Sequence, residues 1–125
     1  MTKLIYPELS YKIVGILFDV HNSLGGGHQE KYYANAISIL LKRKNINFRE
    51  QLKVPLIFKN EKIGNYFLDF LIEDIIVLEI KSGERFTKKD INQVYAYLKS
   101  SSLQLGIIAN FTKGGVRCKR ILNIR

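Results

Sequence analysis

Two carboxylates and a lysine stand inside a segment that otherwise has the pattern of a buried β-hairpin. The apolar runs 63–72 and 75–81 are separated by a short polar turn, and they predict two antiparallel strands. Asp69 belongs to the first strand, whereas Glu79 and Lys81 share one face of the second because they are two residues apart. Burying a charge in a strand is costly unless the charge is paired or binds a metal. The hairpin must therefore provide partners for these three groups.

The turn position predicts which residues of the hairpin face each other. If the chain turns at Glu73-Asp74, Asp69 falls about opposite Leu78, one residue from Glu79. Two carboxylates beside an ammonium make an oxygen-rich site for a hard cation such as Mg²⁺, with Lys81 placed to act on a water or a phosphate. The pattern is short, and an ordinary ion pair at a sheet edge with Glu79 in solvent explains it about equally well.

Length and composition narrow the class of protein. A chain of 125 residues with 46% hydrophobic residues predicts one folded domain over 1–125 with a sizeable core. The single cysteine, Cys118, excludes an internal disulfide and a cysteine-based zinc cluster, and two histidines are too few for most zinc sites. The sequence shows neither a signal peptide nor an apolar run of membrane-spanning length. We therefore expect no membrane association and a cytoplasmic location.

The net charge of +9 is unevenly distributed along the chain. Residues 1–84 carry 11 Lys/Arg and 10 Asp/Glu, whereas residues 85–125 carry 9 Lys/Arg and a single acid, Asp90. A basic half that follows an acidic site is typical of binding to a polyanion, usually a nucleic acid, although simple solubility would require no partner.

Four basic residues near the C-terminus are the predicted nucleic-acid contacts. Alternation along a short strand would place Val116 and Cys118 inward, and cations between them outward. Outward cations near the site would hold phosphates of the backbone. The four predicted contact residues are Lys113, Arg117, Lys119 and Arg120.

Hydrophobic periodicity predicts an order of helices, strands, one more helix and further strands. Gly25-Gly26-Gly27 ends the first helix, and Thr87 followed by Asp90 predicts a capping box at the start of the last one. The predicted helices cover 8–22, 28–44 and 88–100, and the remaining predicted strands cover 47–58, 103–110 and 116–124.

Three polar residues on the predicted helices are further candidates for the site. Glu30 is expected on the inward side near the start of its helix, where it is either a helix cap or a third metal ligand. Gln93 and Tyr97 are four residues apart on one helix face and would reach the site if that helix packs beside the hairpin. Otherwise they are an ordinary, partly exposed pair.

The stretch Gly27-His28-Gln29-Glu30-Lys31-Tyr32-Tyr33 resembles the Gly-x-x-Glu-x-x-Tyr signature of the GxxExxY family, within the PD-(D/E)XK nuclease-like superfamily. The resemblance runs through nearly the whole chain and departs at Gly26, where the family often has proline. Its further elements are Val20 to Gly25, Gly64-x-Tyr66-x-x-Asp69, Glu79-Ile80-Lys81, Gln93-x-x-x-Tyr97-Leu98, Leu105-Gly106-x-x-x-Asn110-Phe111 and Lys119-Arg120.

This resemblance implies an α/β fold with a restriction-endonuclease-like core, a mixed sheet of about four strands flanked by helices. It also implies hydrolysis of phosphodiester bonds with Mg²⁺ or Mn²⁺. Asp69 and Glu79 would bind the metal, with the carbonyl of Ile80 as an extra ligand. Glu30 would bind a second metal or a metal-bound water, and Lys81 would orient the attacking water or stabilise charge on the phosphate.

The expected activity is a metal-dependent nuclease acting on DNA. One alternative is an endonuclease for branched DNA that resembles Holliday-junction resolvases, which would require a homodimer because a symmetric junction needs two active sites. The other is a module that uses the nuclease fold only to bind nucleic acid or a protein.

Overall fold

A computed structural model describes residues 5–84 and 87–124 of the chain. Over these residues the chain forms three helices and five strands, and every predicted element is present with its ends moved by at most two residues. In chain order the elements are α1 (Pro7–Leu24), α2 (Glu30–Arg43), β1 (Phe48–Phe58), β2 (Glu61–Ile72), β3 (Ile76–Ser82), α3 (Lys88–Ser101), β4 (Leu105–Phe111) and β5 (Val116–Leu122).

The strands form one mixed sheet in the order β1-β2-β3-β4-β5. Neighbouring strands are antiparallel except β3 and β4, which are parallel and joined through α3. The sheet has five strands, compared with about four predicted, because β5 pairs with β4 along its whole length, from Leu105↔Leu122 to Phe111↔Val116. The α/β class with a mixed, helix-flanked sheet is confirmed.

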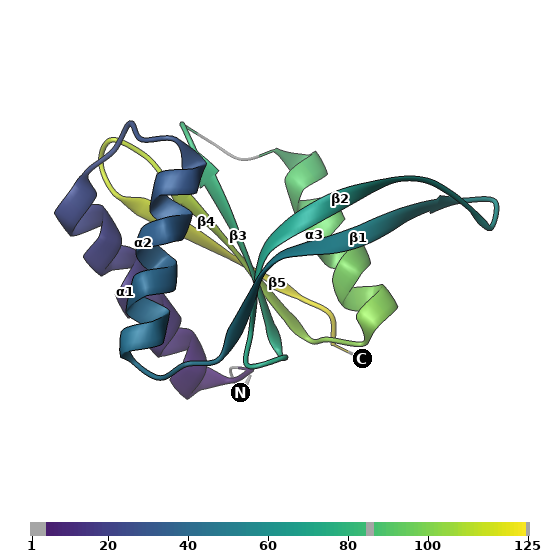
Figure 1. Ribbon diagram of the computed structural model, residues 1–125, viewed down its shortest axis with the longest axis horizontal. Helices are drawn as coiled ribbons and strands as arrows, with labels where there is room; N and C mark the ends of the chain where they lie inside the picture. The colour runs from purple at the N-terminus through teal and green to yellow at the C-terminus, as the bar shows by residue number, and fades with distance from the viewer. Residues whose placement is uncertain (1–4, 85–86, 125) are drawn as a thin grey trace.

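Helices cover both faces of the sheet, with α1 and α2 on one face and α3 on the other (Figure 1). The apolar stripes of α1 and α2 pack on alternate residues of β3 and β4, such as Leu78 and Ile107. The intervening residues, such as Val77 and Ile108, pack under α3. Because side chains alternate across a strand, Val77 places Glu79 and Lys81 on the α3 face.

The turn between α1 and α2 is held against the turn between β4 and β5. Gly25 ends α1 with a positive φ of 73°, and its carbonyl accepts a hydrogen bond from the buried hydroxyl of Tyr33 at 2.7 Å. The Tyr33 ring stacks on Phe111 with the ring centroids 4.1 Å apart. A Cβ on Gly26 would lie only 2.7 Å from the Cα of Lys113, so this position accepts glycine alone. Gly26 therefore allows the two turns to pack closely. The departure from the proline that is common in the GxxExxY family did not indicate this role.

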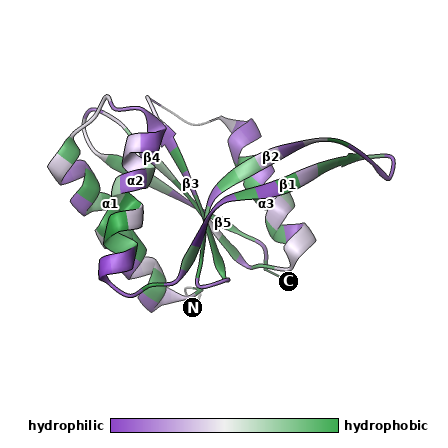
Figure 2. Ribbon diagram, in the orientation of Figure 1, coloured by the Kyte–Doolittle hydropathy of each residue, from purple (hydrophilic) through white to green (hydrophobic). Residues whose placement is uncertain are grey.

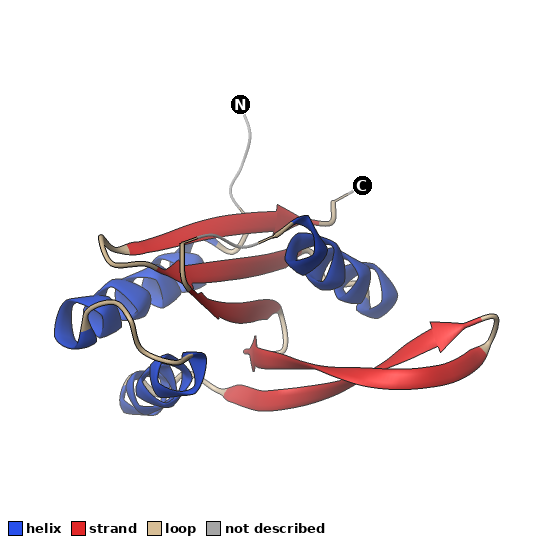
Figure 3. Cartoon of the chain, turned by 90° about the horizontal axis from the view of Figure 1, so that it is seen from above, coloured by secondary structure: helices blue, strands red, loops and turns tan. Residues whose placement is uncertain are grey.

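β1 and β2 form a long hairpin that extends away from the rest of the molecule (Figures 1 and 3). β3 pairs with β2 only along Phe70–Ile72, whereas β1 accompanies β2 from Phe48↔Ile72 to Phe58↔Glu61. The outer part of the hairpin therefore has a partner strand on one side of each strand only.

Candidate active site

Asp69 of β2 and Glu79 of β3 are linked by hydrogen bonds at the point where these two strands diverge. The backbone N–H of Asp69 donates to Oε1 of Glu79 at 2.6 Å, and the N–H of Ile80 donates to Oδ2 of Asp69 at 2.7 Å. The predicted register was wrong by one residue, because Phe70 is the residue opposite Leu78. The turn at Glu73 and Asp74 is confirmed, with both residues in left-handed conformations.

The electrostatics of this pair reflects two acids in a confined space. Burial raises the pKa of Asp69, and the nearby Glu30 carboxylate raises it further. Burial and the negative charge of Asp69 together raise the pKa of Glu79 to about 8. Since each ionised carboxylate opposes ionisation of the other, a positive charge between them would be favourable.

Lys81 continues from Glu79 along the same face of β3 and meets the start of α3. Its Nζ lies 3.4 Å from Oδ1 of Asp90, and both side chains are mostly buried. Partial burial alone would lower the pKa of Lys81, but Asp90, Glu30 and Glu79 together raise it above its ordinary value. Lys81 is therefore a positively charged group at neutral pH.

Glu30, the first residue of α2, reaches the end of β3 from the other side of the sheet. Its Oε2 accepts a hydrogen bond from the backbone N–H of Ser82 at 3.2 Å, and the Ser82 hydroxyl donates to the carbonyl of His28 at 2.6 Å. The side chain is exposed rather than inward, contrary to the helix periodicity. An open pocket of about 470 Å³ is lined by Glu30, Ser82 and residues 27–31.

Gln93 and Tyr97 lie on the side of α3 that faces strands β2 and β3. The hydroxyl of Tyr66 in β2 donates to the backbone carbonyl of Gln93 at 3.3 Å. Burial raises the pKa of Tyr66, and negative charge on Glu79 raises it further. The helix that carries Gln93 and Tyr97 therefore packs beside the strand of Asp69, as the prediction for these two residues required.

The donor groups fit a hard divalent cation. Mg²⁺ in enzymes is typically held by one or two carboxylates, with waters and substrate phosphates completing its coordination. Asp69 and Glu79 supply two crowded carboxylates of this kind. Within residues 5–84 and 87–124, no group of three or more His, Cys, Asp or Glu side chains is arranged as a metal cage.

The four predicted nucleic-acid contacts do not share one surface. Arg117 and Lys119 of β5 are exposed and alternate with residues of the opposite face, as expected, and Lys113 lies in the turn before β5. Arg120 lies on the other face, where its guanidinium donates to the carbonyl of Ile5 at 3.3 Å. The inward placement of Cys118 was wrong, because its side chain is exposed near the open edge of the sheet.

Two residues at the site were not predicted to act there. Asp90 appeared in the sequence only as a helix cap, and nothing in its spacing indicates its contact with Lys81. Asn110 of β4 lies beside Lys81 in the sheet and is 1% exposed, and its amide has no hydrogen-bond partner in the described part of the chain. A buried amide without a partner is rare and marks a strained or functional position. The signal in the sequence that could have identified Asn110 is its position as a polar residue inside the apolar run 105–111.

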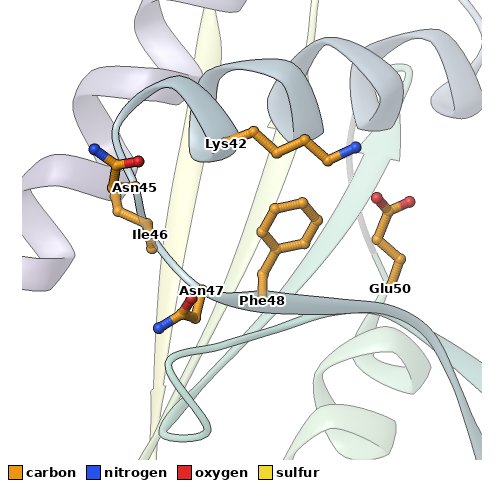
Figure 4. A pocket seen from close by; sticks show the side chains of 6 residues that line it. All are labelled: Lys42, Asn45, Ile46, Asn47, Phe48 and Glu50. Carbon is orange, nitrogen blue, oxygen red and sulfur yellow. The ribbon is translucent and has the colours of Figure 1, made fainter.

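A larger pocket lies elsewhere on the molecule. It has a volume of about 570 Å³, lies between the end of α2 and the start of β1, and opens around Phe48 (Figure 4). Glu50 at its rim accepts a hydrogen bond from the Ser38 hydroxyl at 2.7 Å. None of the predicted site residues lines this pocket, so size alone does not identify the active site.

A mixed sheet with helices on both faces, and with two acids and a lysine on adjoining central strands, defines a nuclease-like α/β protein. The family model described as the PD-(D/E)XK nuclease superfamily matches residues 7–121, and the chain belongs to this superfamily.

Two solved structures have a similar fold. One is the crystal structure of SSO0001, with a TM-score of 0.58 and 18% identity, and the match covers 76% of this chain and 50% of SSO0001. The other is an alkaline exonuclease, LHK-Exo, from Laribacter hongkongensis, with a TM-score of 0.52 and 14% identity. That match covers 99% of this chain and 73% of the exonuclease. The chain thus spans about half the length of SSO0001, and a comparison with curated proteins gave no match. Across the described residues, no helix is long and apolar enough to cross a membrane.

Proposed function

We propose that this protein is a metal-dependent nuclease that hydrolyses phosphodiester bonds in DNA. The observation that carries the proposal is the contact between Asp69 and Glu79, with the charged Lys81 two residues farther along the same strand face. Membership of a nuclease superfamily supports this chemistry, and the basic segment 85–125 supports a polyanionic substrate.

In this proposal the carboxylates of Asp69 and Glu79 would hold Mg²⁺ or Mn²⁺, and the carbonyl of Ile80 would be a further ligand. When bound, the cation would lower the pKa of the attacking water and neutralise charge that develops on the phosphate. Glu30 is proposed to act at a second metal or a metal-bound water, because its carboxylate accepts a hydrogen bond from the N–H of Ser82, the residue after Lys81.

The charge state of Lys81 is compatible with both of its predicted roles. A general base must be neutral to accept a proton, whereas the surrounding carboxylates raise the pKa of Lys81. We therefore propose that the charged Lys81 orients the attacking water or stabilises negative charge on the phosphate. Gln93 and Tyr97 are proposed to hydrogen-bond the phosphate or a water from the neighbouring face of α3.

The test combines metal binding with cleavage. Wild type should bind Mn²⁺ in isothermal titration and cleave members of a panel of labelled duplex, single-stranded and branched DNA with Mg²⁺ or Mn²⁺. Asp69→Ala should lose both properties, whereas Lys81→Ala should lose cleavage and keep its Mn²⁺ affinity. Asp74→Ala is the matched control, because Asp74 is an exposed acid at the turn of the same hairpin.

Each result has a distinct meaning. If Asp69→Ala binds Mn²⁺ as wild type does, the metal site is elsewhere. If wild type cleaves no DNA in the panel, the chain acts as a binding module on a nuclease fold. Membership of the GxxExxY family, a cytoplasmic location, one domain over 1–125 and a homodimer stay predictions.

A further inference from the structure

The outer part of the β1–β2 hairpin carries an unusual density of exposed apolar side chains. We define the arm as residues 53–67, which pair with each other from Lys53↔Phe67 to Phe58↔Glu61. Apolar and polar colouring alternate along the arm, and its tip is polar (Figure 2). The exposed apolar side chains of the arm and their exposed fractions are Leu56 (37%), Ile57 (59%), Phe58 (58%), Ile63 (68%) and Phe67 (53%).

Positive charge accompanies this apolar surface. The arm has three lysines, Lys53, Lys59 and Lys62, and one acid, Glu61. The Nζ of Lys59 lies 5.5 Å from the ring centroid of Phe58, so a cation and an aromatic ring stand together at the tip. Apolar side chains among cations are the combination that proteins use to enter a base stack while holding phosphates.

The backbone of the arm opposes the pairing of two copies edge to edge. Pro55, in the edge strand β1, has no N–H to donate, and the register shifts between Leu56 and Ile57, which leaves Ile63 without an opposite residue. Both features are known protections of edge strands against strand addition. A two-fold contact between arms would also bring equal positive charges together. These features favour nucleic acid over a second copy as the occupant.

The arm begins at the proposed active site. Phe67 is two residues from Asp69 on β2, and Gln51, opposite the same stretch, donates a hydrogen bond to Oδ1 of Asp69 at 3.4 Å. The ten residues from Asn60 at the tip to Asp69 extend for about 30 Å. That length equals about nine base pairs of a DNA duplex.

We propose that the arm is a DNA-binding wedge, in which Phe58 and Ile63 enter the base stack and the lysines hold the adjacent phosphates. This inference rests on the proposed function for its substrate, and it predicts a substrate that extends about nine base pairs beyond the cleaved bond and is unstacked there. The strand that carries Asp69 then joins the wedge and the reaction centre directly.

The test measures binding and unstacking without cleavage. A labelled duplex of about 30 base pairs with 2-aminopurine near its centre is titrated with protein in EDTA. Wild type should bind and raise the 2-aminopurine fluorescence. Phe58→Ala/Ile63→Ala should weaken binding at least about fivefold and abolish the rise in fluorescence. Lys59→Ala/Lys62→Ala should reduce the salt dependence by about two contacts.

Tyr11→Ala is the control, because Tyr11 is an aromatic residue of α1 that is 82% exposed and far from the arm in sequence. Equal binding and fluorescence in wild type and the Phe58/Ile63 variant would overturn the wedge. Sedimentation that shows an arm-dependent dimer with unchanged DNA binding would also overturn it, in favour of a second copy. Arm-dependent binding by a protein that cleaves no DNA would support the wedge and reject the nuclease proposal.

Discussion

The carboxylate of Asp90 joins two structures that are distant in the sequence, the start of α3 and Lys81 on β3. Its Oδ1 lies 3.4 Å from the Nζ of Lys81, and its Oδ2 accepts hydrogen bonds from the backbone N–H and the hydroxyl of Thr87, at 2.8 and 3.1 Å. Burial would raise the pKa of Asp90, but the hydrogen bonds from Thr87 and the charge of Lys81 lower it overall. Asp90 is thus an ionised positioning residue that orients Lys81 from a helix cap.

Replacement of Asp90 should separate these two roles. Asp90→Asn keeps an oxygen that can cap the helix, so the free energy of unfolding should change by about 1 kcal/mol or less. Cleavage should fall about tenfold, and the alkaline limb of the pH–rate profile should move to lower pH, because Lys81 loses a negative neighbour. Asp90→Ala should lose the cap as well, at a cost of about 1 kcal/mol more. Coincident pH profiles for wild type and Asp90→Asn would reject the positioning role.

The raised pKa of Glu79 predicts how stability changes with pH in the absence of metal. Between the ordinary pKa of 4.5 and the folded value of about 8, the folded protein keeps a proton on Glu79 that the unfolded chain releases. The free energy of unfolding should therefore fall as pH rises through this window. We expect a loss of about 2 kcal/mol, less than the full shift because the side chain is partly exposed and coupled to Asp69.

Urea denaturation in EDTA at several pH values measures this loss. Glu79→Gln should remove most of the dependence, whereas Glu61→Gln, at an exposed acid of the arm, should not. Addition of Mn²⁺ at about pH 8 should stabilise wild type more than Glu79→Gln, since a ligand of the folded state stabilises by mass action. A flat profile for wild type would show that the two acids do not crowd each other.

The faces of β5 predict which cations bind DNA. Arg117→Ala/Lys119→Ala should flatten the dependence of log K on log salt by about two contacts, each with a slope of about −0.9. Arg120→Ala should leave the slope unchanged, because Arg120 faces the other side and donates to Ile5. Fluorescence anisotropy over a salt series measures both slopes. If Arg120→Ala flattens the salt dependence more than Arg117→Ala/Lys119→Ala does, the DNA lies on the opposite face of the sheet.

Gly26 provides a test of the packing between the two turns. Gly26→Ala should destabilise the protein by about 1–3 kcal/mol, because the new Cβ meets the Lys113 backbone and neither turn can move freely. Gly15→Ala is the matched control: Gly15 lies inside α1 with no atom near an added Cβ, so alanine should stabilise the helix by about 0.5–1 kcal/mol. Chemical denaturation of the two variants gives the comparison. Similar changes in both would mean that the turns can separate.

Local patterns in the sequence were sufficient to locate the helices and strands and to place Glu79 and Lys81 on one face of β3. The capping box of Thr87 and Asp90 is confirmed, since a cap depends on residues three apart. The hairpin turn at Glu73-Asp74 is confirmed for the same reason. The alternation of β3 correctly placed Glu79 and Lys81 on one face, because side-chain period is a property of the strand itself.

Relationships between distant segments required the tertiary structure. Asp90 meets Lys81, and Arg120 meets Ile5, only because a strand register and a helix crossing bring them together. The strand register predicted for Asp69 was wrong by one residue, and the burial predicted for Cys118 was wrong. Both errors have the same origin, since the local periodicity of side chains specifies neither the register between strands nor which strand lies at the edge of the sheet. Local spacing along the chain predicts which side chains are available for chemistry. The packing of α3 and β5 against β3 and β4 decided which of them meet, because long-range contacts follow from the burial of the whole core.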